Sequence, residues 1–186
     1  MIETERLILR CWRAEDVAEF ARVTNTPAVM EFLGGVRQPE EFQGAFERVT
    51  ASQEQNGFCF WIVERKSDCA LLGFCGLKMG NTAPIIGEIE IGWRLREDAW
   101  GKGYALEAAR ATLDWAWRNL DCKRVVAITA AANRRSWSLM ERVGMHRMYS
   151  IDFDHPDVPV GSKARAHITY SIERPIAGDR ERPKQH

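Results

Sequence analysis

The sequence predicts an α/β fold of the α+β type: a single domain with a central mixed, mostly antiparallel sheet and helices on both faces. Two observations favour it. The expected elements run from a strand through helices to three successive strands and then alternate helix and strand, and no segment repeats. The chain has 186 residues, 45% of them hydrophobic, which is enough for one domain with a sizeable core. We expect this domain at residues 1–174 and a flexible, proline-punctuated tail at 175–186.

The first third of the chain predicts one strand followed by helices. Residues 7–12 form a short apolar run typical of a strand, and residues 14–23 follow with helical spacing of their apolar side chains. A short helical stretch then covers 27–35, and a longer helix covers 39–55 and ends before Gly57.

The remaining two thirds predict a strand-rich middle and alternating elements after it. Residues 58–64 and 71–78 are β-rich runs joined by the polar turn 66–68, so we expect an antiparallel hairpin. The later elements expected from periodicity and turn residues are helices at 103–120 and 133–142 and strands at 88–95, 125–129, 145–153 and 167–173.

The composition argues against several classes of binding partner. The 26 basic and 26 acidic residues cancel, so we expect neither nucleic acid nor a membrane as partner. The charged start of the chain and the absence of any run of about 20 apolar residues predict a cytoplasmic protein. The five cysteines contain no Cys-x-x-Cys pair and the four histidines show no ligand spacing, so no metal is expected.

A glycine-containing turn is the most informative motif. Gly101-Lys102-Gly103 follows a predicted strand and opens a predicted helix. Free backbone N–H groups and the positive end of the helix dipole meet there, and the absent Cβ atoms let a phosphate approach. A helix start made small only for tight packing is the alternative. The spacing fits neither a P-loop nor a dinucleotide fingerprint.

Two ordered motifs together resemble the GNAT N-acetyltransferase superfamily. Trp100–Ala105 opens one helix, and Asn133–Ser136 leads into another that is followed by Glu141–Met145. The resemblance covers about residues 4–173. With Glu90–Trp93, the Asn-x-x-Ser motif looks like the branch that acetylates the N-terminal alanine or serine of ribosomal proteins. The superfamily pattern Gln/Arg-x-x-Gly-x-Gly/Ala begins here on Trp100, a departure from the usual residue.

The resemblance implies acetyl-CoA as the acetyl donor. Its pantetheine would run along the strand that ends near Leu95 and Arg96, whose backbone N–H groups would bind the oxyanion. Asn133 would hydrogen-bond the cofactor, although its residue type also suits a helix N-cap. The residues expected to hold the pyrophosphate are Gly101, Lys102, Gly103, Tyr104 and Ala105.

Acetyl transfer needs a base for the amine and a proton for the departing thiolate. We favour Glu90 over Glu88 as the base, while an exposed carboxylate paired with an arginine is the alternative for either one. The family's usual tyrosine acid falls on Met140, so Ser136 is the candidate donor to the thiolate, and unassisted departure of the thiolate is a second route.

The acceptor is expected to be a primary amine, foremost the α-amino group of a ribosomal or other protein N-terminus. An α-amine has a pKa of about 8 and needs little help to lose its proton. The alternatives are a small amine, such as a polyamine or an antibiotic, and a CoA-binding sensor without catalysis. The sequence leaves the choice between monomer and homodimer open.

Overall fold

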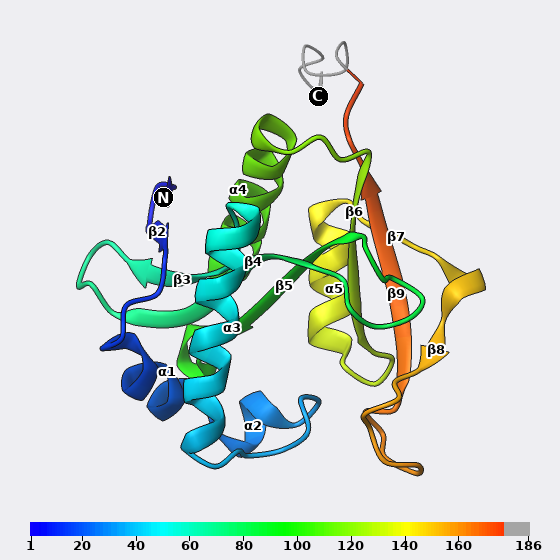
Figure 1. Ribbon diagram of the computed structural model, residues 1–186, viewed down its shortest axis with the longest axis horizontal. Helices are drawn as coiled ribbons and strands as arrows, with labels where there is room; N and C mark the ends of the chain where they lie inside the picture. Colours follow the sequence, from blue (N-terminus) through cyan, green and yellow to red (C-terminus); the bar gives the residue numbers. More distant parts are fainter. Residues whose placement is uncertain (177–186) are drawn as a thin grey trace.

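The computed structural model describes residues 1–176 (Figure 1). All of the predicted tail except residues 175 and 176 lies outside the described residues. Within this range one sheet holds nine strands in the order β1-β2-β3-β4-β5-β6-β9-β7, with β8 also paired to β9. The strands are β1 (Ile2–Glu3), β2 (Leu7–Arg10), β3 (Phe60–Arg65), β4 (Leu71–Met79), β5 (Ile89–Leu95), β6 (Arg124–Ala130), β7 (His146–Arg147), β8 (Phe153–Asp154) and β9 (Ala166–Glu173).

Helices cover both faces of this sheet, as predicted. One core cluster joins Phe20 and Phe42 to Ile62 of β3, and the other joins the apolar side of α4 and Met140 of α5 to the opposite face. No helix of the described residues is long and apolar enough to cross a membrane. The helices are α1 (Asp16–Thr24), α2 (Pro27–Met30), α3 (Glu40–Asn56), α4 (Tyr104–Asn119) and α5 (Arg134–Val143), with 3-10 turns at η1 (Glu97–Ala99) and η2 (Tyr149–Ile151).

The pairing of β5 with β6 shapes the centre of the molecule. Every other neighbouring pair is antiparallel, but β5 and β6 run parallel and share a single register pair, Glu90 with Val126. Beyond that pair the two strands diverge toward their carboxyl ends (Figure 1). The gap in the backbone ladder therefore opens where β5 leads into the glycine turn and β6 leads into α5.

Two local predictions are corrected. The expected strand at 145–153 is wrong, because β7 and β8 are separated by η2. Thr169 of β9 bonds to both ends of this turn: its hydroxyl donates to the Ile151 carbonyl oxygen (3.2 Å), and the Met148 N–H donates to the Thr169 carbonyl oxygen (2.8 Å). The strand β1 was not predicted, since two residues are too short to show a period.

Candidate functional site

The glycine turn has the conformation of an anion-binding loop. Gly101 and Gly103 have φ angles of +72° and +81°, in the left-handed region that side chains with a Cβ seldom adopt. Among the described residues, the backbone N–H groups of Gly101, Lys102 and Gly103 donate to no acceptor. The first turn of α4 adds further free N–H groups and the positive end of the helix dipole. These groups fit the pyrophosphate of a nucleotide such as CoA.

Arg6 holds the turn from a distant part of the sequence. Its Nη1 donates to the Lys102 carbonyl oxygen (3.0 Å) and its Nε to Oε2 of Glu107 (2.7 Å). The guanidinium also lies over the Tyr104 ring, 4.6 Å from the centroid. Because its charge is paired with Glu107, Arg6 holds the shape of the turn rather than offering a free positive charge to a ligand.

Trp100 connects the turn to both neighbouring elements. Its indole Nε1 donates to the carbonyl oxygen of Leu95 at the end of β5 (2.9 Å). The Arg135 guanidinium from the first turn of α5 lies 4.5 Å from the Trp100 ring centroid. The residue that departs from the superfamily pattern thus brings the start of α5 to the glycine turn.

The start of α5 carries the second predicted motif. Oδ1 of Asn133 accepts the Ser136 N–H (3.3 Å), so Asn133 is the N-cap of α5. No hydrogen bond within residues 1–176 involves the Ser136 hydroxyl. Met140, at the position of the usual tyrosine, is only 1% exposed and packs in the core, so it faces no substrate.

The hydrogen bonds at the end of β5 decide which backbone N–H groups are free to bind an oxyanion. The Arg96 N–H donates to the Leu72 carbonyl oxygen on β4 (2.8 Å), so it is not free for the oxyanion, and that part of the prediction is wrong. Residues of a strand point their N–H groups alternately to the two neighbouring strands. The N–H groups of Leu95 and Trp93 accordingly point toward the gap that separates β5 from β6.

Glu90 is a buried carboxylate at the point where β5 and β6 separate. The residue is 7% exposed, and its Oε2 lies 3.1 Å from the Lys78 ammonium without a hydrogen bond of good geometry. Burial raises the pKa of Glu90 above its usual range, and the charge of Lys78 opposes this only in part. A raised pKa makes the carboxylate a better proton acceptor.

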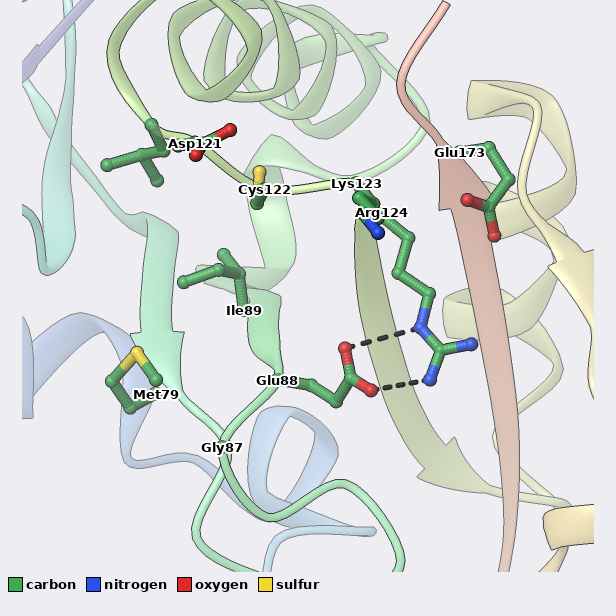
Figure 2. A pocket seen from close by; sticks show the side chains of 10 residues that line it. Met79, Gly87, Glu88, Ile89, Asp121, Cys122, Lys123, Arg124 and Glu173 are labelled. Carbon is green, nitrogen blue, oxygen red and sulfur yellow. Dashed lines mark hydrogen bonds and ion pairs between the residues drawn. The ribbon is translucent and has the colours of Figure 1, made fainter.

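Glu88, the less favoured candidate for the base, is part of an ion pair. Figure 2 shows its carboxylate against the Arg124 guanidinium, with distances of 3.2 Å to Nε and 2.5 Å to Nη2. The hydrogen bond to Arg124 lowers the pKa of Glu88. The pair lines a pocket of about 640 Å³ at the amino ends of β5 and β6. This pocket lies at the other end of the strands from the glycine turn, and Glu90 does not line it.

Comparison with known proteins identifies the family of this architecture. Residues 6–146 match the family model described as an acetyltransferase (GNAT) domain. The Bacillus subtilis protein YkkB, described as uncharacterized, is 31% identical over 147 residues, which are 77% of this chain and 83% of that protein.

Solved structures share the fold. An acetyltransferase from Agrobacterium tumefaciens has a TM-score of 0.75 at 27% identity and covers 92% of this chain, which in turn covers 93% of that one. Two others are similar in fold alone. A spermidine N-acetyltransferase from Vibrio cholerae in complex with CoA and spermine (TM-score 0.71, 18% identity) covers 92% of this chain and 97% of its own. The match to the ribosomal-protein-S5-alanine acetyltransferase from Vibrio fischeri (TM-score 0.72, 16% identity) covers 92% of this chain and 95% of that one.

Proposed function

The chain belongs to the GNAT acetyltransferase family, which transfers the acetyl group of acetyl-CoA to an amine, and we propose that its acceptor is the α-amino group of a protein N-terminus. The observation that carries this proposal is Glu90, a buried carboxylate with a raised pKa where β5 and β6 part. One carboxylate of this kind is a modest base. It suits an α-amine with a pKa of about 8 better than a lysine amine with a pKa of about 10.4.

We propose that the glycine turn binds the pyrophosphate of acetyl-CoA. The N–H groups of residues 101–105 would bind its oxygens, and the Lys102 side chain would add positive charge, while Arg6, ion-paired with Glu107, would hold the turn in shape. Asn133 already caps α5 through Oδ1, which leaves its amide Nδ2 for the cofactor. Support comes from the V. cholerae relative, whose structure contains CoA.

The transfer step follows from the groups around the gap. The amine nitrogen attacks the thioester carbonyl carbon, a C–N bond forms, and Glu90 takes the amine proton directly or through water. The N–H group of Leu95 or that of Trp93, which lie too far apart along the strand to share one oxygen, would stabilise the oxyanion. The C–S bond then breaks, and the Ser136 hydroxyl would donate a hydrogen bond to the departing CoA thiolate, which is also stable enough to leave unaided.

An acceptor screen tests the proposal. Purified protein with acetyl-CoA is offered peptides with free N-termini, polyamines and aminoglycosides, and thiol release is measured. We expect turnover with the peptides, and none when their α-amine is blocked. Turnover with polyamines or aminoglycosides alone would show a small-molecule enzyme. Binding of acetyl-CoA without turnover of any acceptor would favour a CoA-binding sensor.

A further inference from the structure

Arg94 is a cation of β5 that has no anionic partner. It lies directly opposite Phe74 of β4, and its Cζ is 5.4 Å from the Phe74 ring centroid and 5.7 Å from that of Phe20 on α1. Its Nε is buried and hydrogen-bonded to nothing. Within residues 1–176 no carboxylate lies within ion-pairing distance of its guanidinium. A desolvated charge left in this state is costly for a fold to maintain.

The surface around Arg94 is partly open. Along the same face of β5, Gly92 separates Arg94 from Glu90, and the ring of Phe60 lies over Gly92, where a Cβ would come within 2.9 Å of Phe60 Cζ. Phe60 stacks on Phe74 with ring centroids 4.7 Å apart. Arg94, Gly92, Phe60 and Phe74 are all only half-buried. A ligand can therefore reach this aromatic floor and the guanidinium beside it.

A second positive charge acts on Arg94. Burial, and then the charge of Arg37 in the loop before α3, lower the pKa of Arg94 to about 10. Arg94 remains a cation at neutral pH, and within residues 1–176 its charge is offset by the faces of the Phe20 and Phe74 rings but by no carboxylate. Within residues 1–176 the ion-pair partner of Arg37 is distant, with 3.9 Å between its Nη1 and Oε1 of Glu41.

We propose that Arg94 binds a carboxylate of the acceptor, so that the substrate class is an amine that also carries an acidic group. This inference rests on the proposed function, because it takes Glu90 as the place where the amine reacts. Glu90 and Arg94 are four strand residues, about 13 Å, apart on one face. An extended peptide advances about 3.3 Å per residue. Allowing for the reach of the side chains, an α-amine at Glu90 places an acidic second or third residue at Arg94.

The substrate series uses the unmodified protein. Amidated hexapeptides begin with alanine and carry Glu-Glu, Gln-Gln or Lys-Lys at positions two and three, and free glutamate and glutamine, both as their α-amides, form a second arm. We expect kcat/KM for the Glu-Glu peptide to exceed that for Gln-Gln about tenfold, the scale of a charge-assisted hydrogen bond, with Lys-Lys lowest. A preference for the acid among the free amino acids alone would make the acceptor a small molecule. Equal rates for acid and amide in both arms overturn the inference and leave the acetyltransferase intact.

Variants locate the effect. Arg94→Met should remove the acid preference through KM, Arg94→Lys should keep part of it, and Arg118→Met, which removes an exposed charge from α4, should keep all of it. If Arg94→Met lowers kcat/KM equally for the Glu-Glu and Gln-Gln peptides, Arg94 has only a packing role. That result would contradict the proposal. If that variant does not fold, the substrate series decides. If the wild-type protein acetylates no acceptor at all, the proposed function itself fails.

Discussion

Glu88 and Glu90 stand two residues apart, yet their surroundings shift their carboxyl pKa values in opposite directions. Two hydrogen bonds to Arg124 lower the pKa of Glu88, whereas burial raises that of Glu90. The carboxylate of Glu88 is held by two hydrogen bonds, whereas that of Glu90 is buried and has one oxygen 3.1 Å from the Lys78 ammonium without a hydrogen bond. Residue type alone predicted both as candidates, and the environment distinguishes them.

The loss of activity at low pH should reflect protonation of Glu90. A base works only when deprotonated, so activity is lost as pH falls through its pKa, and a raised pKa moves this loss to a higher pH than for an ordinary glutamate. Lys78 lowers the pKa of Glu90, so Lys78→Met should move the loss higher still. Glu90→Gln should lower kcat/KM roughly 100-fold and recover partly at high pH, where more of the α-amine is neutral. The measurement is kcat/KM from pH 5 to 9.

Glu88→Gln is the matched control for this experiment, because it removes the same charge two residues away. Its pH profile should equal that of the wild-type protein. A loss in Glu90→Gln that does not vary with pH would assign Glu90 a positioning role rather than that of the base.

Gly103 tests the anion-binding turn. In Gly103→Ala the residue at φ +81° gains a Cβ that lies 3.3 Å from Nη2 of Arg6, so both the turn and its cation must shift. Gly57, which ends α3 at φ +76° with open space around it, provides a control with similar strain. Each alanine should cost about 1 kcal/mol of stability. Only Gly103→Ala should abolish the rise in Tm that acetyl-CoA gives, and a full rise in that variant would contradict the assignment.

Among the elements, the loop from β5 to α4 depends on Trp100. Trp100→Phe keeps a ring for Arg135 but loses the hydrogen bond to Leu95, which is worth about 1 kcal/mol. The Kd for acetyl-CoA should therefore rise about fivefold, while kcat at saturation stays the same. Isothermal titration measures the Kd. Trp115→Phe on α4 should leave it unchanged, since the Trp115 indole N–H makes no hydrogen bond within residues 1–176. A fivefold rise in both variants would refute a specific role for Trp100.

Elements with a clear period or cap were predictable from sequence, and those held by distant partners were not. Residues 103–120 predicted α4, and Gly57 and Gly144 end α3 and α5 in the left-handed conformation, as expected of helix caps. The sequence of segment 145–153 is typical of a continuous strand, but Thr169 of β9 forms hydrogen bonds with the turn η2 in its middle. Local sequence carries no signal of such a contact.

At the scale of the whole molecule, the fold brings together site residues that the sequence kept apart. Arg6 lies 96 positions before Lys102, and nothing near it suggested a role beside the glycine turn. Arg94 could have been found, because strand alternation places it on the same face as Glu90 and Gly92. Its lack of a partner, however, depends on the packing of α1 and β4. A sequence motif can be recognised locally, but the contacts that complete a binding site come from residues far away in the sequence.

The stability of the whole chain should increase when the charge of Glu90 is removed. A carboxyl with a pKa raised by folding contributes stability that is fully present below its unfolded pKa and is lost as pH rises through the folded pKa. At neutral pH the ionised Glu90 therefore weakens the fold, and glutamine removes that charge while it keeps the shape. Glu90→Gln should raise the free energy of unfolding by on the order of 1 kcal/mol and Tm by about 2–4 °C at pH 7.5. The gain should shrink toward pH 4, where the wild-type carboxyl is protonated as well. Thermal unfolding of both proteins from pH 4 to 8 measures it, and a Glu90→Gln variant that is less stable than wild type at pH 7.5 would show that the Lys78 ion pair outweighs the cost of burial.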